Sequence, residues 1–272
     1  MTRVAVAGLG LIGGSAALAF GAAGFDRDPG VRERARRRGI AVAETLAEGV
    51  AGAEVVMTAA PTAHTPELLR EVAALAPGAL LTDTASLKAP IVRAAQGLRE
   101  GVRFVAGHPM AGSRREGVEA ADAGLFRGRP WVLLSTARTG PGDVAVLSEL
   151  VRGVGARPIE LAADLHDRLM TWVSHLPHAV AASLVRAAAP ETRDELAALA
   201  GPGFLDSTRI AGRRRELALE LALADPEALA RAIDAVREEL ARIASALRAG
   251  DAVAVGRLFD EAAAIRKSLD PG

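Results

Sequence analysis

The stretch VAVAGLGLIG, residues 4–13, decides the fold of the first half of the chain. Its four small apolar residues predict a buried parallel strand, and the G-x-G-x-x-G that follows is typical of a strand-to-helix turn that binds a dinucleotide. Gly8 permits the tight turn, Gly10 lets the backbone approach a pyrophosphate, and Gly13 allows close helix–strand packing. The helix after the turn offers its N-terminal N–H groups and positive dipole end to the phosphates. We therefore predict cofactor contacts at Gly8, Gly10, Leu11, Ile12 and Gly13.

Asp26 follows the next predicted strand, Ala22–Phe25, where an acidic side chain can accept hydrogen bonds from the adenosine ribose hydroxyls. Its negative charge would repel the 2′-phosphate of NADP, so the sequence favours NAD, although the arginines at 27 and within 32–38 leave NADP open. Asp26 is only 13 residues beyond Gly13, which leaves room for about two helical turns and a short strand. Either this βαβ unit is truncated or Asp26 lies away from the expected position.

Composition excludes several classes of protein. The formal net charge is zero, which argues against a general nucleic-acid binder, and the absence of cysteine excludes disulfides and thiolate chemistry and fits a cytoplasmic enzyme. The uncharged stretch Val4–Phe25 follows Arg3 and could be taken for a signal peptide or a membrane span. Its six glycines would weaken a membrane helix, so we predict a strand and a glycine turn there, and no membrane segment.

The pattern of the chain changes near residue 161. Up to that point short apolar runs alternate with amphipathic stretches, as in a parallel α/β sheet; beyond it good helix formers dominate. We predict a Rossmann-type dinucleotide-binding domain over residues 1–161 and an all-helical substrate and dimerisation domain over residues 162–272, through which the chain forms a homodimer. The predicted strands are Val4–Ala7, Ala22–Phe25, Glu54–Ala59, Ala79–Thr82, Phe104–Ala106, Trp131–Leu134 and Pro158–Leu161.

Four further segments bring polar residues to predicted strand ends or helix faces: TDTASLK at 82–88, GHPMAGS at 107–113, SHLPH at 174–178 and FLDSTRI at 204–210. Ligands of open parallel sheets bind beyond the carboxyl ends of the strands, where the first two segments are expected. This order of segments behind GLGLIGGS resembles the prephenate/arogenate dehydrogenase family of tyrosine biosynthesis. The resemblance covers nearly the whole chain, and GHPMAGS with SHLPH carries it more specifically than the glycine motif.

The resemblance implies a prephenate dehydrogenase, which transfers hydride from C4 of prephenate to NAD while loss of CO2 from C1 gives 4-hydroxyphenylpyruvate. His108 matches the family's catalytic histidine; an imidazole titrates near neutral pH and suits a general base for the C4 hydroxyl proton. Ser86 matches the serine that orients this hydroxyl and the histidine. Arg209 matches the arginine that binds the ring carboxylate, for which a planar, always-charged guanidinium is suited. His178, His175 and Ser113 match or adjoin the family's substrate-binding positions.

Simpler interpretations remain open for the two catalytic candidates. His108 precedes Pro109 and could simply cap a strand end. Ser86 could be the N-cap of a helix over Leu87–Leu98, alone or together with a catalytic role. Asp167, near the start of a long helix predicted over Asp164–Ala189, is interpreted as a helix-terminus charge and not as an acid catalyst.

The substrate-binding candidates also have simpler interpretations. His175 and His178 are three residues apart on one helix face, a spacing that can bind a metal, but no carboxylate or cysteine is grouped beside them. We therefore predict no metal site. Arg209 could instead have only a structural role, as the ion-pair partner of a neighbouring acid such as Asp206. The segment Gly212–Ala218 differs from the Ser-Asp-Pro and tryptophan that family members commonly carry, which leaves the contact to the partner subunit open.

Three other functions stay as alternatives. Arogenate dehydrogenase, which forms tyrosine, differs only in whether the substrate side chain ends in an amino acid or a keto acid. A β-hydroxyacid dehydrogenase would rely on a lysine in the helical domain, where only Lys267 is present. A non-catalytic NAD-sensing protein would need no general base at His108.

Overall fold

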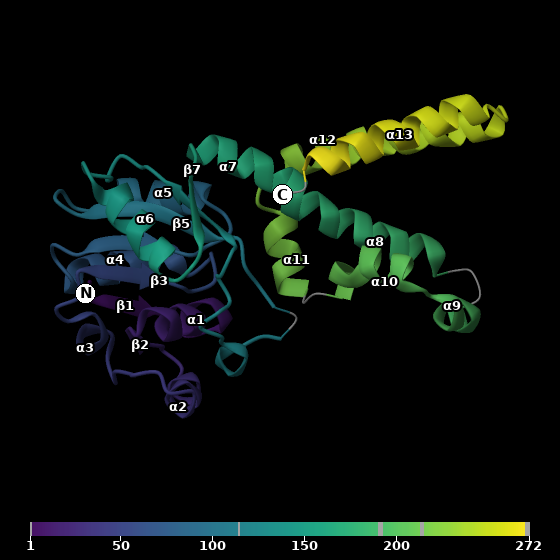
Figure 1. Cartoon of the computed structure of the whole chain (residues 1–272). Helices are drawn as coiled ribbons and strands as arrows, with labels where there is room; N and C mark the ends of the chain where they lie inside the picture. The colour runs from purple at the N-terminus through teal and green to yellow at the C-terminus, as the bar shows by residue number, and fades with distance from the viewer. Residues whose placement is uncertain (1, 114, 190–192, 213–214, 270–272) are drawn as a thin grey trace. The chain divides into compact units, whose positions relative to one another are not determined.

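The structure is a computed structural model that describes residues 2–113, 115–189, 193–212 and 215–269 (Figure 1). The chain divides into two compact units, residues 1–167 and residues 168–272. The first unit contains all seven strands of the sheet, and every regular element among the described residues of the second is a helix. The predicted fold class, a Rossmann-type sheet domain followed by helices, is confirmed.

The seven strands form one sheet in the order β2-β1-β3-β4-β5-β6-β7. The first five are parallel, but β6 pairs antiparallel with β5, so the prediction of a wholly parallel sheet was wrong at this edge. Among the described residues of the connection from β5 to β6, the 3₁₀ turn Val118–Ala120 is the one helical element, and no α-helix crosses over the sheet. The strands are β1 (Val4–Ala7), β2 (Ala23–Phe25), β3 (Val55–Thr58), β4 (Leu80–Asp83), β5 (Arg103–Pro109), β6 (Pro130–Leu134) and β7 (Arg157–Glu160).

Helices cover both faces of this sheet, which explains why its strands are continuous apolar runs. Val4 and Val6 belong to the core cluster with residues of α1, α2 and α6, whereas Ala5 and Ala7 belong to the cluster with α3, α4 and α5. Burying a large apolar side chain in these clusters stabilises the fold by about 1.5–3 kcal/mol. The helices are α1 (Leu11–Phe20), α2 (Pro29–Arg37), α3 (Leu46–Val50), α4 (Thr65–Leu75), α5 (Ala89–Gln96) and α6 (Asp143–Gly153).

The helix predicted over residues 164–189 is present, with a local change of winding. It consists of α7 (Ala163–Met170), a π-helical turn (Thr171–His175) and α8 (Leu176–Ala188). Pro177 has no N–H to donate to residue 173, and its ring crowds the preceding turn; the wider π turn accommodates this. The remaining helices are α9 (Arg193–Leu199), α10 (Pro202–Thr208), the 3₁₀ helix η3 (Arg209–Gly212), α11 (Arg215–Ala222), α12 (Pro226–Arg248) and α13 (Ala252–Ser268).

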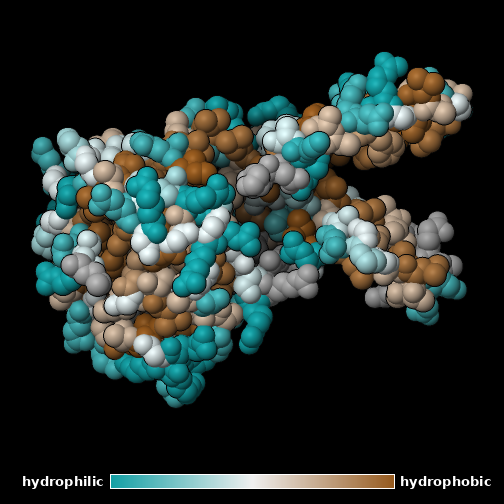
Figure 2. Space-filling view, viewed as in Figure 1, coloured by the Kyte–Doolittle hydropathy of each residue, from teal (hydrophilic) through white to brown (hydrophobic). Residues whose placement is uncertain are grey.

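The second unit buries few of its own apolar side chains. Its core cluster is small, centred on Leu176, Leu229 and Ala232. Many large apolar residues remain exposed, including Val253 at 77% and Phe259 at 60% exposure. Figure 2 shows hydrophobic surface, in brown, along the projecting α12 and α13. None of the described helices is both long enough and apolar enough to span a bilayer.

Candidate active site

The glycine turn between β1 and α1 is shaped by three glycines with different surroundings. Gly8 has a φ of +100°, and a Cβ there would lie 2.6 Å from the carbonyl oxygen of Ala59. A Cβ at Gly13 would lie 1.9 Å from the carbonyl oxygen of Gly8. At Gly10, by contrast, a Cβ would meet no atom within 4 Å. The turn is therefore closely packed at Gly8 and Gly13 and open at Gly10, where a pyrophosphate could approach the backbone.

Asp26 lies directly against this turn. Its Oδ2 accepts a hydrogen bond from the backbone N–H of Leu9 at 2.8 Å, and its Oδ1 accepts one from the N–H of Asp28 at 3.0 Å. The short spacing from Gly13 is accommodated because α1 has ten residues and β2 only three. Of the two readings left open by the sequence, the truncated βαβ unit is the one the structure contains, and Asp26 is placed beside the glycines.

Arg32 also contacts Asp26, through the backbone of that residue. Its Nη1 donates a hydrogen bond to the backbone carbonyl of Asp26 at 2.8 Å, and its guanidinium lies 5.6 Å from the centre of the Phe25 ring. Both contacts hold the guanidinium close to the end of β2. An arginine therefore stands beside the acidic residue that would meet the adenosine ribose.

His108 lies within β5, which extends through Pro109 and so is longer than the predicted strand 104–106. It pairs with Val132 of β6 and is 8% exposed. His108 is therefore the next-to-last residue of β5, near the end of the strand. The antiparallel pairing with β6 continues the ladder past the parallel neighbour β4, and this carries His108 beyond the end of the parallel part of the sheet.

His108 contacts a second histidine that the sequence motifs do not include. Its Nδ1 lies 3.0 Å from Nε2 of His166 on α7, with the two rings edge to face at 71°. Nδ1 of His166 lies in turn 2.7 Å from Oδ1 of Asp167. His166 is 1% exposed. The adjacency of a histidine and an aspartate at the start of the helix was the only signal for this group in the sequence.

Asp167 is a helix-terminus charge, as interpreted, but the terminus that it contacts belongs to α5, whereas Asp167 itself lies on α7. Its Oδ2 accepts a hydrogen bond from the N–H of Ala89 at 3.1 Å, at the first turn of α5. Because Lys88 occupies the N-cap position of α5, Ser86 is not its N-cap, and that alternative for Ser86 was wrong. Ser86 lies instead, half-buried, in the loop between β4 and α5.

A buried ion pair holds this loop to β5. Nζ of Lys88 donates to Oδ2 of Asp83 at 2.6 Å and to the carbonyl oxygen of Gly107 at 2.5 Å, and both charged side chains are fully buried. Oδ1 of Asp83 accepts the N–H of Gly107 at 3.1 Å. Burial lowers the pKa of Lys88, an effect that the carboxylate of Asp83 opposes. The pair thus fixes the residue that directly precedes His108.

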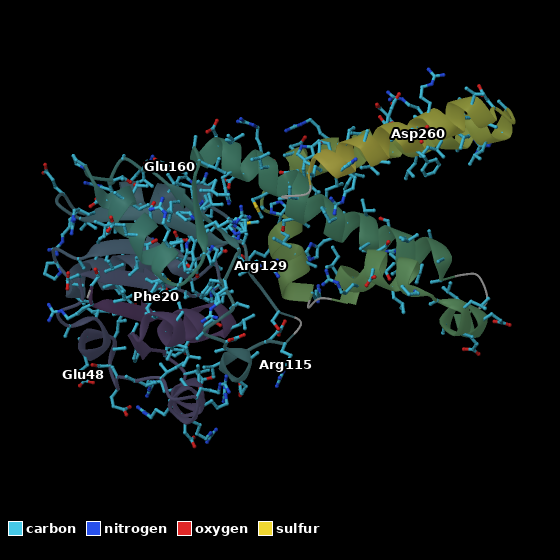
Figure 3. All side chains as sticks on the ribbon, in the orientation of Figure 1. Phe20, Glu48, Arg115, Arg129, Glu160 and Asp260 are labelled. Carbon is cyan, nitrogen blue, oxygen red and sulfur yellow. The ribbon has the colours of Figure 1, made fainter. Side chains whose placement is uncertain are left out.

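Ser113 lies in the loop after β5, half-buried, and its hydroxyl accepts the N–H of Arg115 at 3.1 Å. The side chain of Arg115 extends from this loop (Figure 3). This hydrogen bond closes a local turn within the loop.

The other predicted substrate-binding residues belong to the second unit. His175 is buried in the π turn, and Nδ1 of His178 lies 2.9 Å from the carbonyl oxygen of Ser174 one turn earlier. Arg209 is exposed on η3, which packs against α8. Among the described residues, no ion pair joins Arg209 to Asp206, and no three histidine or carboxylate side chains are grouped as metal ligands.

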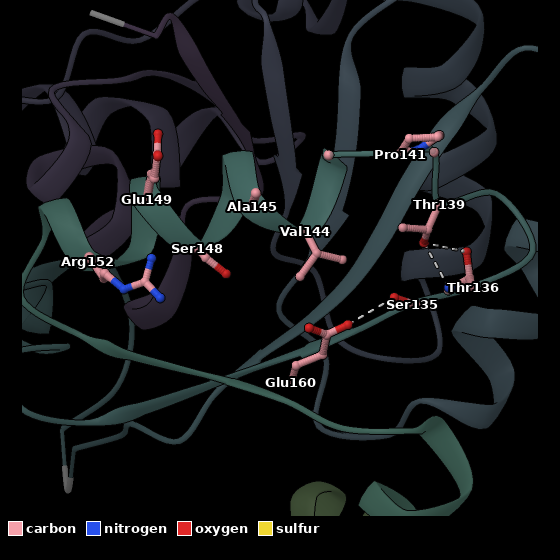
Figure 4. A pocket seen from close by; sticks show the side chains of 12 residues that line it. Ser135, Thr136, Thr139, Pro141, Val144, Ala145, Ser148, Glu149, Arg152 and Glu160 are labelled. Carbon is pink, nitrogen blue, oxygen red and sulfur yellow. Dashed lines mark hydrogen bonds between the residues drawn. The ribbon is translucent and has the colours of Figure 1, made fainter.

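The segment after Arg209 is described only in part. Arg213 and Arg214 of the divergent stretch lie outside the described residues. A surface pocket elsewhere, between α6 and the edge of the sheet, contains none of the predicted site residues (Figure 4). It is lined by polar side chains such as Ser135 and Glu160, which are joined by a hydrogen bond of 3.4 Å. This pocket lies at the β7 edge of the sheet, whereas the glycine turn follows β1, near the opposite edge.

Comparison with known families assigns both parts of the chain. A model described as the nucleotide-binding domain of prephenate dehydrogenase matches residues 20–160, and one described as its dimerization domain matches residues 162–261. The chain belongs to the prephenate dehydrogenase family. The resemblance inferred from the sequence motifs is therefore confirmed, and with it the assignment of an oxidoreductase.

Similar proteins of the prephenate dehydrogenase family match over nearly the full chain. Prephenate dehydrogenase of Lactococcus lactis subsp. cremoris is 35% identical over 99% of this chain and 78% of its own length. A prephenate dehydrogenase from A. aeolicus, in complex with hydroxyphenyl propionate and NAD+, is 26% identical with a TM-score of 0.87 over 99% of both chains. Arogenate dehydrogenase of Synechocystis is 28% identical with a TM-score of 0.85 over 99% of this chain and all of its own.

Proposed function

We propose that this chain is a prephenate dehydrogenase that oxidises and decarboxylates prephenate to 4-hydroxyphenylpyruvate with NAD. The observation that carries this proposal is the open backbone above Gly10 with Asp26 beside it, in the same compact unit as the buried His108. The open glycine turn suits a pyrophosphate, and the carboxylate suits ribose hydroxyls. The similarity to a prephenate dehydrogenase that binds NAD+ supports the same cofactor.

In this reaction His108 accepts one proton from the substrate and later returns it. Bound NAD supplies the acceptor for the hydride that leaves C4 of prephenate. The imidazole of His108 accepts the proton of the C4 hydroxyl, a role that contributes about 10²–10⁴-fold to rate in enzymes of this kind. When CO2 leaves C1, the electron pair of the broken C–C bond enters the ring, and the oxygen on C4 takes back the proton that His108 holds. Ser86 is proposed to orient the hydroxyl and the histidine.

The second unit supplies the proposed substrate-binding side chains. We assign Arg209 to the ring carboxylate, because an exposed guanidinium offers two parallel donors to a carboxylate. His178, His175 and Ser113 are assigned to the rest of the substrate. Of these, His175 is buried at 3% exposure, which fits a role in shaping the site.

A homodimer formed through the second unit is the proposed assembly. The exposed apolar residues of this unit include Leu223, Leu240, Leu247 and Ile265, each more than 60% exposed. Large apolar side chains exposed in such number are typical of a helical unit that packs against a partner. The match of this part of the chain to a dimerization domain supports the same conclusion.

Arogenate is the second candidate substrate, because an arogenate dehydrogenase is among the similar structures. A spectrophotometric assay of NADH or NADPH formation, with prephenate and arogenate each tried with NAD and NADP, tests both proposals. We expect the highest kcat/KM with prephenate and NAD. Faster turnover of arogenate would reverse the substrate assignment, and no reduction in any of the four combinations would contradict the proposed function.

A further inference from the structure

His108, His166 and Asp167 form a chain of hydrogen bonds. Because its last member, Asp167, is a carboxylate, the positions of the protons on both imidazoles are defined. Asp167 can only accept hydrogen bonds, so the Nδ1 of His166, at 2.7 Å, must carry the proton and donate it. In a neutral His166 the Nε2 then has the lone pair. The Nδ1 of His108, 3.0 Å away, therefore carries a proton and donates to that lone pair.

This arrangement decides which nitrogen of His108 can act as a base. With Nδ1 protonated, the lone pair of neutral His108 is on Nε2. A general base needs an unprotonated nitrogen toward its substrate, so the contact with His166 prepares one tautomer for the reaction. When His108 takes up a proton, its Nδ1–H still donates to His166, whose own N–H is held by the carboxylate. The buried imidazolium is thereby stabilised.

The carboxylate itself is held in place from outside the histidine pair. The N–H of Ala89 donates to Oδ2 of Asp167 at 3.1 Å, and the N–H of Lys88 approaches Oδ1 at 3.4 Å, both at the start of α5. The positive end of that helix favours a negative charge at this point. Lys88 also holds Gly107, next to His108, through its side chain. Residues at the start of α5 therefore hold both ends of the hydrogen-bonded series. Their N–H groups hold the carboxylate of Asp167, and the side chain of Lys88 holds the backbone of Gly107 next to His108.

We propose that His166 and Asp167 are positioning residues for His108, which they hold in the tautomer with the proton on Nδ1 and the lone pair on Nε2. This proposal rests on the proposed dehydrogenase reaction for its effect on rate. The hydrogen-bonded chain itself lies entirely within residues 1–167 and has a separate spectroscopic signature.

Asparagine at position 167 provides a sharp test, since it keeps the shape and changes the hydrogen-bonding pattern. The N–H of Ala89, 3.1 Å from Oδ2, is a closer donor than the N–H of Lys88, 3.4 Å from Oδ1, so the amide oxygen of Asp167→Asn would face Ala89 and its NH2 would face His166. That NH2 can only donate. Nδ1 of His166 would lose its proton, Nε2 would gain one, and His108 would in turn be protonated on Nε2. The whole chain of hydrogen bonds would reverse, and His108 could no longer accept the substrate proton.

Two measurements on the full-length protein follow, with Asp164→Asn as the matched control because it makes the same change on an exposed position of α7. We expect Asp167→Asn to lower kcat with prephenate by about 100-fold or more, with KM changed by less than about threefold. Asp164→Asn should retain the wild-type kcat. ¹⁵N NMR of the histidines, of which the chain has five, should show His108 and His166 protonated on Nδ1 in the wild type and on Nε2 in Asp167→Asn.

Each measurement can overturn the proposal separately. Wild-type protein with neutral His166 protonated on Nε2 would disprove it without any variant, even if Asp167→Asn failed to fold. A kcat for Asp167→Asn equal to that of Asp164→Asn would also disprove it. A lower kcat with unchanged tautomers would make Asp167 a purely structural residue. If the wild type reduced neither cofactor, the proposed function would fail, while the NMR result would still decide the hydrogen-bonded chain.

Discussion

Oδ2 of Asp26 accepts the backbone N–H of Leu9 at 2.8 Å, so the acidic residue after β2 is tied to the glycine turn after β1. This hydrogen bond holds the carboxylate beside the place proposed for the adenosine ribose. It also places one negative charge where NADP would bring its 2′-phosphate. We therefore expect the choice between NAD and NADP to depend on the charge of this one side chain, with Arg32 held nearby by the carbonyl of the same residue.

Asp26→Asn keeps an acceptor oxygen for Leu9 and removes the charge. We expect NAD to bind about tenfold more weakly, since a hydrogen bond to a charged group contributes about 1.5–3 kcal/mol, and the preference for NAD over NADP to fall. The ratio of kcat/KM for the two cofactors measures this. Asp28→Asn, which alters only the cap of α2, is the control. An unchanged ratio in Asp26→Asn would show that the carboxylate does not select the cofactor.

Gly10 and Gly13 should respond differently to the same methyl group. Gly10→Ala meets no neighbour within 4 Å, so the protein should keep its Tm while the Kd for NADH, measured by fluorescence titration, rises. Gly13→Ala would place a Cβ 1.9 Å from the carbonyl of Gly8 and should destabilise the fold by about 1–3 kcal/mol. Unchanged NADH binding in Gly10→Ala would place the pyrophosphate elsewhere.

Lys88→Met should destabilise the first unit strongly, because it leaves the carboxylate of Asp83 buried without its cation. Removal of one partner of a buried pair costs about 3–5 kcal/mol, measured here as the free energy of unfolding in urea. The double variant Lys88→Met with Asp83→Asn should recover part of this loss, since the amide carries no charge. A single variant as stable as the wild type would show that the pair contributes nothing.

The same lysine has a predictable effect on pH dependence. Burial lowers the pKa of Lys88 in the folded state, so between that lowered pKa and the ordinary value of 10.5 the unfolded chain binds more protons. The contribution of Lys88 to stability is therefore complete above 10.5 and decreases as the pH falls through the lowered pKa. In Lys88→Met this dependence should be absent from urea unfolding curves recorded between neutral pH and pH 10. Parallel pH profiles in both proteins would contradict the assignment.

Arg209→Ala should raise the KM for prephenate by about 10- to 100-fold, equivalent to about 1.4–2.8 kcal/mol of lost binding, while Arg209→Lys should lose less. Steady-state kinetics at saturating NAD measures both. Asp206→Ala is the control, because no ion pair joins it to Arg209 among the described residues. A KM unaffected in Arg209→Ala would remove its proposed role with the ring carboxylate.

Much of the fold could be predicted because its signals are local. Six of the seven strands begin and end within one residue of their predicted bounds, and the glycine turn is where the motif indicated. The direction of β6 could not be predicted, since an apolar run has the same pattern in a parallel and an antiparallel ladder. The direction of β6 follows from the connection before Pro130, whose described residues contain no crossover α-helix.

The sequence by itself determined the family, the glycine turn and the identity of the candidate residues His108, Ser86 and Arg209, because each rests on a short contiguous motif. The tertiary structure decided that Asp26 reaches the turn, that Lys88 is buried against Asp83, and that His108 contacts His166, which in turn contacts Asp167. These contacts join residues up to 79 positions apart, as between Asp167 and Lys88. Their hydrogen bonds depend on how α5 and α7 pack beside the sheet, and local sequence patterns carry no information about that packing.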